Sequence, residues 1–526
     1  MARTDALASG QLEVAVPDAR DRAARGLALL LVVALVSGLA VWVISPRFEI
    51  DAPSLVDDWA SLSRSGDQVA ELIRLDNPED HRFVPSLAVW SYVQWHTFDA
   101  PRGLVGPNFW NLVRVLGLVV GLSLFTAVAL PFRRGVWNAV LYAALAGIPA
   151  FAVVTVPKFA RDMARFGPQE PMLVGALALG GALLALAARS LLTTSRPLGR
   201  WSTAALAIAG SAVWVFGAYH KETSVCAAPL VAAVLFAGRA RLGAWPLLCT
   251  SRRLALGALA VVVAAPLLHV ALEGSRLAAR GDLIYGAEVQ GGRDVWTGFR
   301  NLYDWAHEPL PENARLLMWG AIALTVVAAV VRRRFDPIAT GALVSGVLSL
   351  AFAGQSGVLA TRYYIPAYAL FAVAFALSLA RLPAPVQVAG VLSVFFAFMP
   401  PPGTRDEVVR WTDEEQAGAE VMREARELES SGCTIAIAGA DLETTLALPV
   451  LVRLEPGSGT RSCEGAAAYL VVGPSLAGPL AEACAPGASE AIVEGPLVSL
   501  HRCDRLRAGA KAERLVALHR FDSTVG

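Results

Sequence analysis

The chain has 526 residues, a formal net charge of +1, 55% hydrophobic residues and only 17% charged residues. Soluble domains contain about 25% charged residues, so this chain has too little charge to coat the surfaces of several soluble domains. The hydrophobic content excludes intrinsic disorder, and the lack of a basic excess argues against a nucleic-acid-binding protein. The composition indicates an integral membrane protein.

Apolar segments that are long enough to span a membrane recur along the chain. About 20 apolar residues in a helix cross a bilayer core of about 30 Å. Eleven candidate spans follow in chain order: 26–45, 110–131, 136–156, 171–188, 201–219, 223–238, 254–272, 314–331, 338–354, 364–381 and 384–400. The segments 223–238, 338–354 and 384–400 are short. We predict an α-helical polytopic membrane module over 26–401, preceded by a charged tail of residues 1–25.

Arginines and acids are sorted between alternate loops. Arg133, Arg134 and the arginines at 332–334 lie in loops on one side, whereas the long loops 46–109 and 273–313 contain more acids than arginines. The positive-inside rule places the arginine-rich loops and the N-terminal tail in the cytoplasm. Arginine greatly outnumbers lysine and alanine is abundant, which suggests a GC-rich bacterial genome and therefore a bacterial inner membrane.

Residues 402–526 follow an odd number of spans, so we place them on the extracytoplasmic side. A charged helix is predicted at 412–430, with helical stretches near 441–452 and 477–484. Short apolar strands are predicted at 434–438, 468–472 and 491–493, with a further candidate at 498–501. This alternation predicts a small α/β domain.

The cysteines of this tail support its location. Cys433, Cys463, Cys484 and Cys503 all lie in it. Disulfides persist in oxidising compartments, so the cysteines fit an extracytoplasmic domain. Four cysteines allow three pairings, and the sequence does not choose among them.

An acidic pair, Asp57-Asp58, lies about ten residues past the first span, on the predicted outer side. Adjacent carboxylates near a membrane surface repel each other and are costly to desolvate, although a solvated loop is the plain alternative. Downstream, the run from His81-Arg82 to Pro85 leads into an aromatic-rich stretch that fits an interfacial helix. Asn111-Leu112 then opens the second span.

This arrangement resembles the GT-C glycosyltransferases, which are polyprenol-phosphate-sugar-dependent membrane enzymes such as the protein O-mannosyltransferases and the aminoarabinose transferases. These enzymes have a first span, a short acidic motif, an Arg-Pro-containing amphipathic helix and an Asn-Leu start of the second span. Here two residues separate Arg82 from Pro85. The resemblance covers roughly 26–400. It implies a carboxylate general base, Asp57 or Asp58, a polyprenyl-phosphate sugar as donor, and in some members a divalent metal such as Mg²⁺ or Mn²⁺.

A second charged group follows the third span. Lys158, Arg161, Asp162 and Arg165 lie within about two helical turns, so we expect three cations and one acid to share one face and its borders. The resemblance implies an acid in this loop, Asp162 or Glu170, as a second acid or metal ligand. The three cations are candidates for binding the donor phosphate. A helix that pairs with lipid headgroups is the alternative.

Two further polar groups stand at predicted outer helix ends. Lys221 and Glu222 lie in a short turn between spans, where charges are costly unless they are paired. Arg362 opens the tenth span, and its planar fork suits phosphate. By resemblance, Lys221 and Arg362 bind the donor phosphate, and Glu222 holds Lys221 or binds a metal. A snorkelling turn and an aromatic belt are the alternatives. Acceptor contacts or other roles are assigned to His81, Arg82, His220 and Tyr363.

The leading hypothesis is a membrane glycosyltransferase that moves a sugar from polyprenyl phosphate to a cell-envelope acceptor on the outer face. The general base would remove the acceptor proton, and cations or a metal would stabilise the leaving phosphate. One alternative is a transporter or flippase of lipid-linked substrates, which needs charged or broken helices near the bilayer midplane. The other is a non-catalytic scaffold that displays the tail. The chain has no P-loop, dinucleotide fingerprint, serine-hydrolase elbow or zinc-protease motif.

Overall fold

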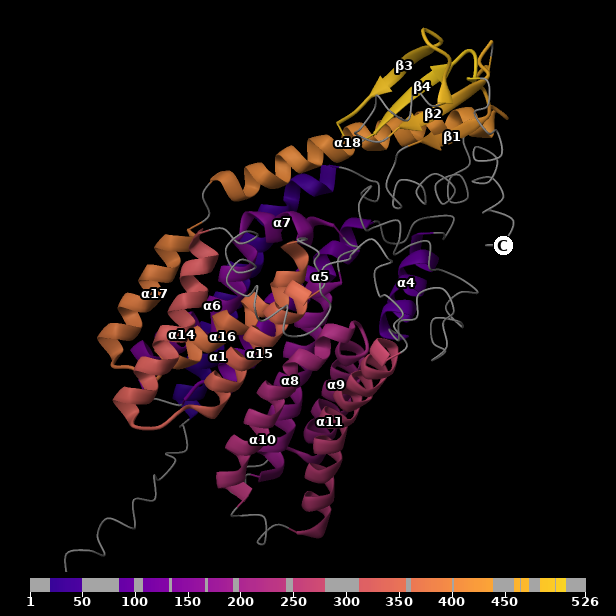
Figure 1. Cartoon of the computed structure of the whole chain (residues 1–526). Coiled ribbons are helices and arrows are strands. Elements are labelled where there is room, and N and C mark those ends of the chain that lie inside the picture. The colour runs from indigo at the N-terminus through magenta and orange to yellow at the C-terminus, as the bar shows by residue number, and fades with distance from the viewer. Residues whose placement is uncertain are drawn as a thin grey trace, which may run out of the picture.

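The computed structural model consists of a helical bundle with a small sheet beyond one of its ends (Figure 1). It describes residues 19–49, 85–98, 107–131, 135–165, 169–192, 198–242, 249–279, 312–355, 361–399, 402–438, 458–463, 465–472, 483–496 and 498–507. The predicted helices near 441–452 and 477–484 lie largely outside these ranges.

The apolar periodicity of the sequence becomes a series of helices. They are α1 (Ala19–Ile44), η1 (Ser45–Glu49), α4 (Pro85–Phe98), α5 (Pro107–Ala129), α6 (Val136–Val154), α7 (Pro157–Ala164), α8 (Glu170–Leu192), α9 (Arg200–Ala218), η2 (Glu222–Ala227), α10 (Ala228–Leu242), α11 (Thr250–Ala279), α14 (Glu312–Arg332), α15 (Pro337–Gln355), η4 (Thr361–Tyr364), α16 (Ile365–Leu379), α17 (Ala384–Phe398) and α18 (Pro402–Ser430).

The described helices match the predicted spans. Nine of them are long and apolar enough to cross a membrane, and two shorter apolar helices, Glu222–Ala237 and Pro337–Ala353, stand where short spans were predicted. The chain is therefore a multi-pass helical membrane protein.

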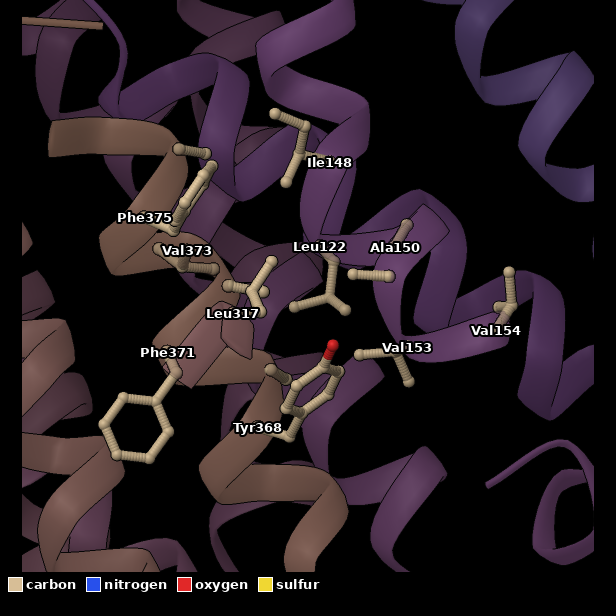
Figure 2. Close-up of a cluster of buried hydrophobic side chains, with 14 of the residues drawn as sticks. Leu122, Ile148, Ala150, Val153, Val154, Leu317, Tyr368, Phe371, Val373 and Phe375 are labelled. Atoms are coloured by element: carbon tan, nitrogen blue, oxygen red, sulfur yellow. The ribbon is translucent and has the colours of Figure 1, made fainter. Parts of the chain in front are cut away.

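The central helix of the bundle is α16. Nearly all of its side chains are buried, and α5, α6, α8, α14 and α15 contact it. Small residues recur along α16, which lets neighbouring helices approach closely. Figure 2 shows the ring of Tyr368 beside Leu122 of α5 and Val153 of α6. The same ring packs on Phe159 of α7, with centroids 5.4 Å apart, so the core of the bundle also holds α7.

Glycines allow the helices α5, α8 and α9 to cross at short distance. A Cβ atom added at Gly121 of α5 would lie 2.5 Å from the carbonyl oxygen of Gly175 of α8. A Cβ atom at Gly180 of α8 would lie 2.6 Å from the backbone nitrogen of Trp214 of α9. Because α8 and α9 pack this closely, the first turn of α8 and the turn after α9 reach the same end of the bundle.

This crossing predicts a position-specific effect of alanine. We expect Gly121→Ala to lower the free energy of unfolding by about 1–3 kcal/mol, because the added methyl group meets backbone atoms that have no rotamer with which to yield. Gly117 lies one turn earlier in α5 and has nothing within 4 Å of an added Cβ atom, so Gly117→Ala should be neutral or slightly stabilising. Thermal unfolding of the purified protein in detergent measures both variants. Equal melting temperatures would contradict the close crossing.

The C-terminal tail forms a four-stranded sheet, which confirms the predicted strands. β1 (Ile435–Ala438) pairs in parallel with β2 (Ala468–Val472), and β4 (Ser499–Cys503) pairs antiparallel with both β2 and β3 (Ser489–Glu494). The strand order is β1-β2-β4-β3. Disulfides join Cys433 to Cys463 and Cys484 to Cys503, which selects one of the three possible pairings.

Helix α18 connects this sheet to the bundle and lies across one end of it (Figure 1). The charge pattern predicted a helix from 412, but α18 begins earlier, at Pro402. Its first turns are stabilised by burial, because Val408 and Trp411 belong to the core of the bundle. Thr404 Oγ1 also donates a hydrogen bond to the carbonyl of Thr155, at 3.1 Å. The tail and α7 therefore lie at the same end of the bundle.

Candidate functional site

A buried ion pair joins two of the predicted site residues. Lys221 lies in the turn between α9 and η2, and its ammonium group contacts the carboxylate of Glu170, the first residue of α8. Only 5% of Lys221 and 1% of Glu170 are exposed. An acid at a helix N-terminus is favoured by the helix dipole, which explains the position of Glu170. A buried charge without its partner is costly, so each residue depends on the other.

A second cation, Arg362, lies near Lys221, because both side chains contact the ring of Tyr363. Lys221 Nζ lies 4.2 Å from the centroid of the Tyr363 ring, and the guanidinium carbon of Arg362 lies 5.1 Å from that centroid. Arg362 Nη2 also donates to the Tyr363 hydroxyl, at 3.4 Å. Cation–π attraction and hydrogen bonding thus gather two positive charges around one ring. The sequence predicted Lys221, Arg362 and Tyr363 as separate candidates, and the structure brings them together.

His220 lies beside Lys221, beyond the end of α9, and is buried. Burial, together with the positive charges of Lys221 and Arg114, lowers the pKa of His220 to about 3. Its ring packs on Phe216, with centroids 5.1 Å apart. His220 is therefore neutral at physiological pH and adds no charge to the two cations. It remains available as a hydrogen-bonding group.

The titration of His220 predicts a loss of stability in acid. The folded pKa is depressed below the unfolded value of about 6.5, so the unfolded chain binds more protons between that pH and about 3. Stability from this residue is complete above pH 6.5 and falls as the pH drops toward 3, with a slope of up to about 1.4 kcal/mol per pH unit. Melting temperatures at pH 7.5 and pH 5 should therefore differ less for His220→Asn than for the wild type. His269→Asn, which removes a different histidine and leaves His220 in place, is the control. Identical pH dependence in the wild type and His220→Asn would contradict the assignment.

The four charged residues around α7 occupy different surroundings. Asp162 and Arg165 are buried and form an ion pair at 3.7 Å. Arg161 instead pairs with Glu407 of α18, at 3.8 Å, and Lys158 is exposed. The four residues therefore differ in exposure and in partner, although all lie in or next to α7. Helix α7 ends at Ala164 and the backbone of Arg165 is extended, but Arg165 still pairs with Asp162, three residues earlier.

Two polar side chains of α5 hold the end of α7 in place. Asn111 Nδ2 donates to the carbonyl of Ala164 at 2.7 Å, and Arg114 Nη2 donates to the carbonyl of Met163 at 3.1 Å. A cation near a helix C-terminus also interacts favourably with its dipole. Sequence reasoning used Asn111 only as part of a motif and assigned no role to Arg114. The sequence could have indicated this role, because burying an Asn and an Arg three residues apart in an apolar span costs free energy unless both have partners.

The acidic pair and its neighbours lie outside the described residues. Asp57, Asp58, His81 and Arg82 all fall within 50–84, for which no placement is described. The chain is described again at Pro85, where α4 begins, and the backbone N–H of Ser86 donates to the carbonyl of Tyr219 at 3.3 Å. The first turn of α4 is therefore fixed next to the His220–Lys221 turn.

Two of the candidate carboxylates are held by cations. Glu170 pairs with Lys221, and Asp162 pairs with Arg165. Within the described ranges, no three His, Cys, Asp or Glu side chains gather in a way that could hold a metal ion. The metal-ligand role that the resemblance implies for Asp162, Glu170 or Glu222 stays a prediction.

Comparisons with known proteins find a similar solved structure at low sequence identity. No family model and no curated protein matches the chain. Among solved structures, the chain is similar to ArnT from Cupriavidus metallidurans in a crystal structure with undecaprenyl phosphate bound. The identity is 13% and the TM-score 0.48, over 90% of this chain and 97% of that chain. A likeness at this level assigns no residue, so the roles of the site residues depend on the contacts described above.

Proposed function

We propose that this protein is a membrane glycosyltransferase that moves a sugar from a polyprenyl-phosphate donor to an acceptor outside the cytoplasm, in a bacterial inner membrane. The observation that carries the proposal is the meeting of Lys221 and Arg362 at Tyr363, next to Glu170. These groups lie at the end of a membrane-spanning bundle, where the phosphate of a membrane-anchored lipid would also lie.

The two cations suit the departure of a phosphate. As the bond between the sugar C1 atom and the phosphate oxygen breaks, negative charge grows on the leaving polyprenyl phosphate. Positive groups that are already in place stabilise this charge, and they act more strongly when they are shielded from water. Arg362 offers a planar fork to phosphate oxygens, whereas Lys221 offers a compact charge. Glu170 holds Lys221 in position in the absence of donor.

A carboxylate completes the reaction. Asp57 or Asp58 accepts the proton of the acceptor hydroxyl, whose oxygen then forms the new bond to C1 while polyprenyl phosphate leaves. Attack from the face opposite the phosphate inverts the configuration at C1. Support for this role comes from the acidic motif in the sequence.

The proposal is tested by incubating the purified full-length protein in lipid nanodiscs with hexosyl and pentosyl undecaprenyl phosphates and a bacterial cell-envelope extract that supplies the acceptor. We expect one donor class to be consumed, with release of undecaprenyl phosphate. Arg362→Gln should lower this rate roughly a hundredfold, as expected for the loss of one group that stabilises the leaving charge. Arg200→Gln, an exposed change at the other end of α9, is the matched control.

Two results would contradict the proposal. One is a wild-type protein that consumes none of the donors but moves fluorescent lipid-linked substrates across the bilayer, which would favour a flippase. The other is an equal rate of donor consumption in Arg362→Gln and in the Arg200→Gln control, which would show that Arg362 takes no part in the reaction.

A further inference from the structure

We infer that a second site, for a phosphate-bearing anion, lies at the opposite end of the bundle, between α14, α15 and α16. α16 begins beside Arg362 and ends at Leu379, so the two ends of this helix border different sites. A cavity of about 180 Å³ lies where α14 ends and α15 begins. A water molecule occupies about 30 Å³ of liquid, so the cavity has room for a phosphate group.

The walls of this cavity are strongly basic. Arg332, Arg334 and Arg381 line it, and Asp336 is the only acid among the lining residues. Asp336 has other structural roles, because its Oδ1 atom accepts the backbone N–H groups of Ile338 and Ala339 at the start of α15. The cavity therefore keeps an excess of positive charge.

The arginines are held in position by the fold. Arg381 Nε donates to Asp336 Oδ2 at 2.6 Å, and Arg332 Nε donates to the backbone carbonyl of Arg381 at 2.9 Å. Both guanidinium groups are thus fixed at the cavity wall before any ligand arrives. Preorganised arginines lose less conformational entropy when they bind an anion, which favours a bound phosphate over a diffuse counterion.

Polar groups also line the inner part of the cavity. The hydroxyls of Thr325 and Ser378 lie 2.9 Å apart, both residues are buried, and both line the cavity. Thr325 also donates to the carbonyl of Ala321 at 2.7 Å. Because Thr325 donates to Ala321, Ser378 must donate to Thr325, so both hydroxyl hydrogens are used within the fold. The donors for phosphate oxygens are therefore the guanidinium groups of the surrounding arginines.

The surroundings of the cavity are apolar. Phe335, which lines it, is 68% exposed, and Val330 and Val331 at the end of α14 are 71% and 60% exposed. Exposed apolar side chains at the end of a spanning helix face lipid in a bilayer. Basic pockets between spanning helices bind anionic lipid headgroups. The phosphate can thus belong to a phospholipid headgroup, and a free phosphate ion offers the same chemistry.

The test compares two neighbouring arginines in the full-length protein. Both Arg333 and Arg334 are exposed, but only Arg334 lines the cavity. Purified wild type, Arg334→Gln and Arg333→Gln are titrated in detergent with phosphatidylglycerol, phosphatidylcholine or inorganic phosphate, and bound ligand is counted by native mass spectrometry. We expect saturable binding of phosphatidylglycerol, weakened about tenfold in Arg334→Gln and unchanged in Arg333→Gln.

The outcomes distinguish the two sources of phosphate. If inorganic phosphate neither binds nor competes with phosphatidylglycerol, the ligand is a lipid headgroup. If inorganic phosphate binds and Arg334→Gln weakens its binding, the ligand is the free ion. Equal binding of phosphatidylglycerol and phosphatidylcholine would overturn the inference, as would equal effects of the two substitutions. Neither result depends on glycosyl transfer.

Discussion

Replacing both Asp57 and Asp58 with asparagine is expected to abolish glycosyl transfer while leaving donor binding intact. A general base contributes about 10²–10⁴-fold to rate, because it removes the acceptor proton as the new bond forms. Asparagine keeps the size of the side chain but cannot accept that proton at neutral pH. The single variants should differ, and the one with the larger loss identifies the base.

The control for this experiment is another acid of the same segment. Asp67→Asn removes one negative charge from the loop 46–109 without touching the acidic motif. It should therefore retain the wild-type rate. Binding of undecaprenyl phosphate and the melting temperature are measured for every variant, so that loss of the base is separated from loss of the fold. Full transfer by Asp57→Asn, Asp58→Asn and the double variant would show that neither residue is the general base.

Removing the charge of Lys221 is expected to have the second large effect, on both stability and activity. Lys221→Met leaves the carboxylate of Glu170 buried without its partner, and breaking a buried pair costs about 3–5 kcal/mol. Transfer should be lost as well, because one of the two cations proposed to stabilise the leaving phosphate is gone. Thermal unfolding and donor consumption measure the two losses separately.

A double variant separates these two roles of Lys221. Lys221→Met with Glu170→Gln removes both charges, and replacing a whole buried pair is often neutral for stability. We expect the melting temperature to recover toward that of the wild type, with a coupling free energy typical of residues in direct contact. Transfer should remain absent, because no cation replaces Lys221. A double variant that regains both stability and transfer would show that Lys221 is only structural.

The helical spans could be predicted because hydropathy is a local property of the sequence. The segment that became α16 reads as an apolar helix whatever its neighbours are, because in lipid each backbone group must find its partner within the helix. The strands of the tail were predicted for a similar reason, since short apolar runs between polar ones favour strands. The start of α18 was not predicted. Its first turns are stabilised by the burial of Val408 and Trp411 against the bundle, which no local pattern records.

The individual charges of the site could be predicted, but not their partners. Lys221 and Arg362 stood out because cations at outer helix ends are exceptions to the charge sorting of the loops. Their meeting at Tyr363 depends on the packing of η4 and of the turn after α9. Likewise, Arg161 and Arg165 looked equivalent on a helical spacing. In the structure they pair with different acids, Arg161 with Glu407 of α18 and Arg165 with Asp162 of α7.

The sequence by itself determined that this is a multi-pass helical protein with a small α/β tail, and which charged residues are costly enough to need an explanation. Hydropathy and charge act over a few residues, so they can be followed along the chain. Only the tertiary structure decided that Lys221 pairs with Glu170, that Arg114 holds α7, and which cysteines are joined. These contacts join segments that are distant in sequence, and helix crossings such as that of Gly180 with Trp214 set their distances.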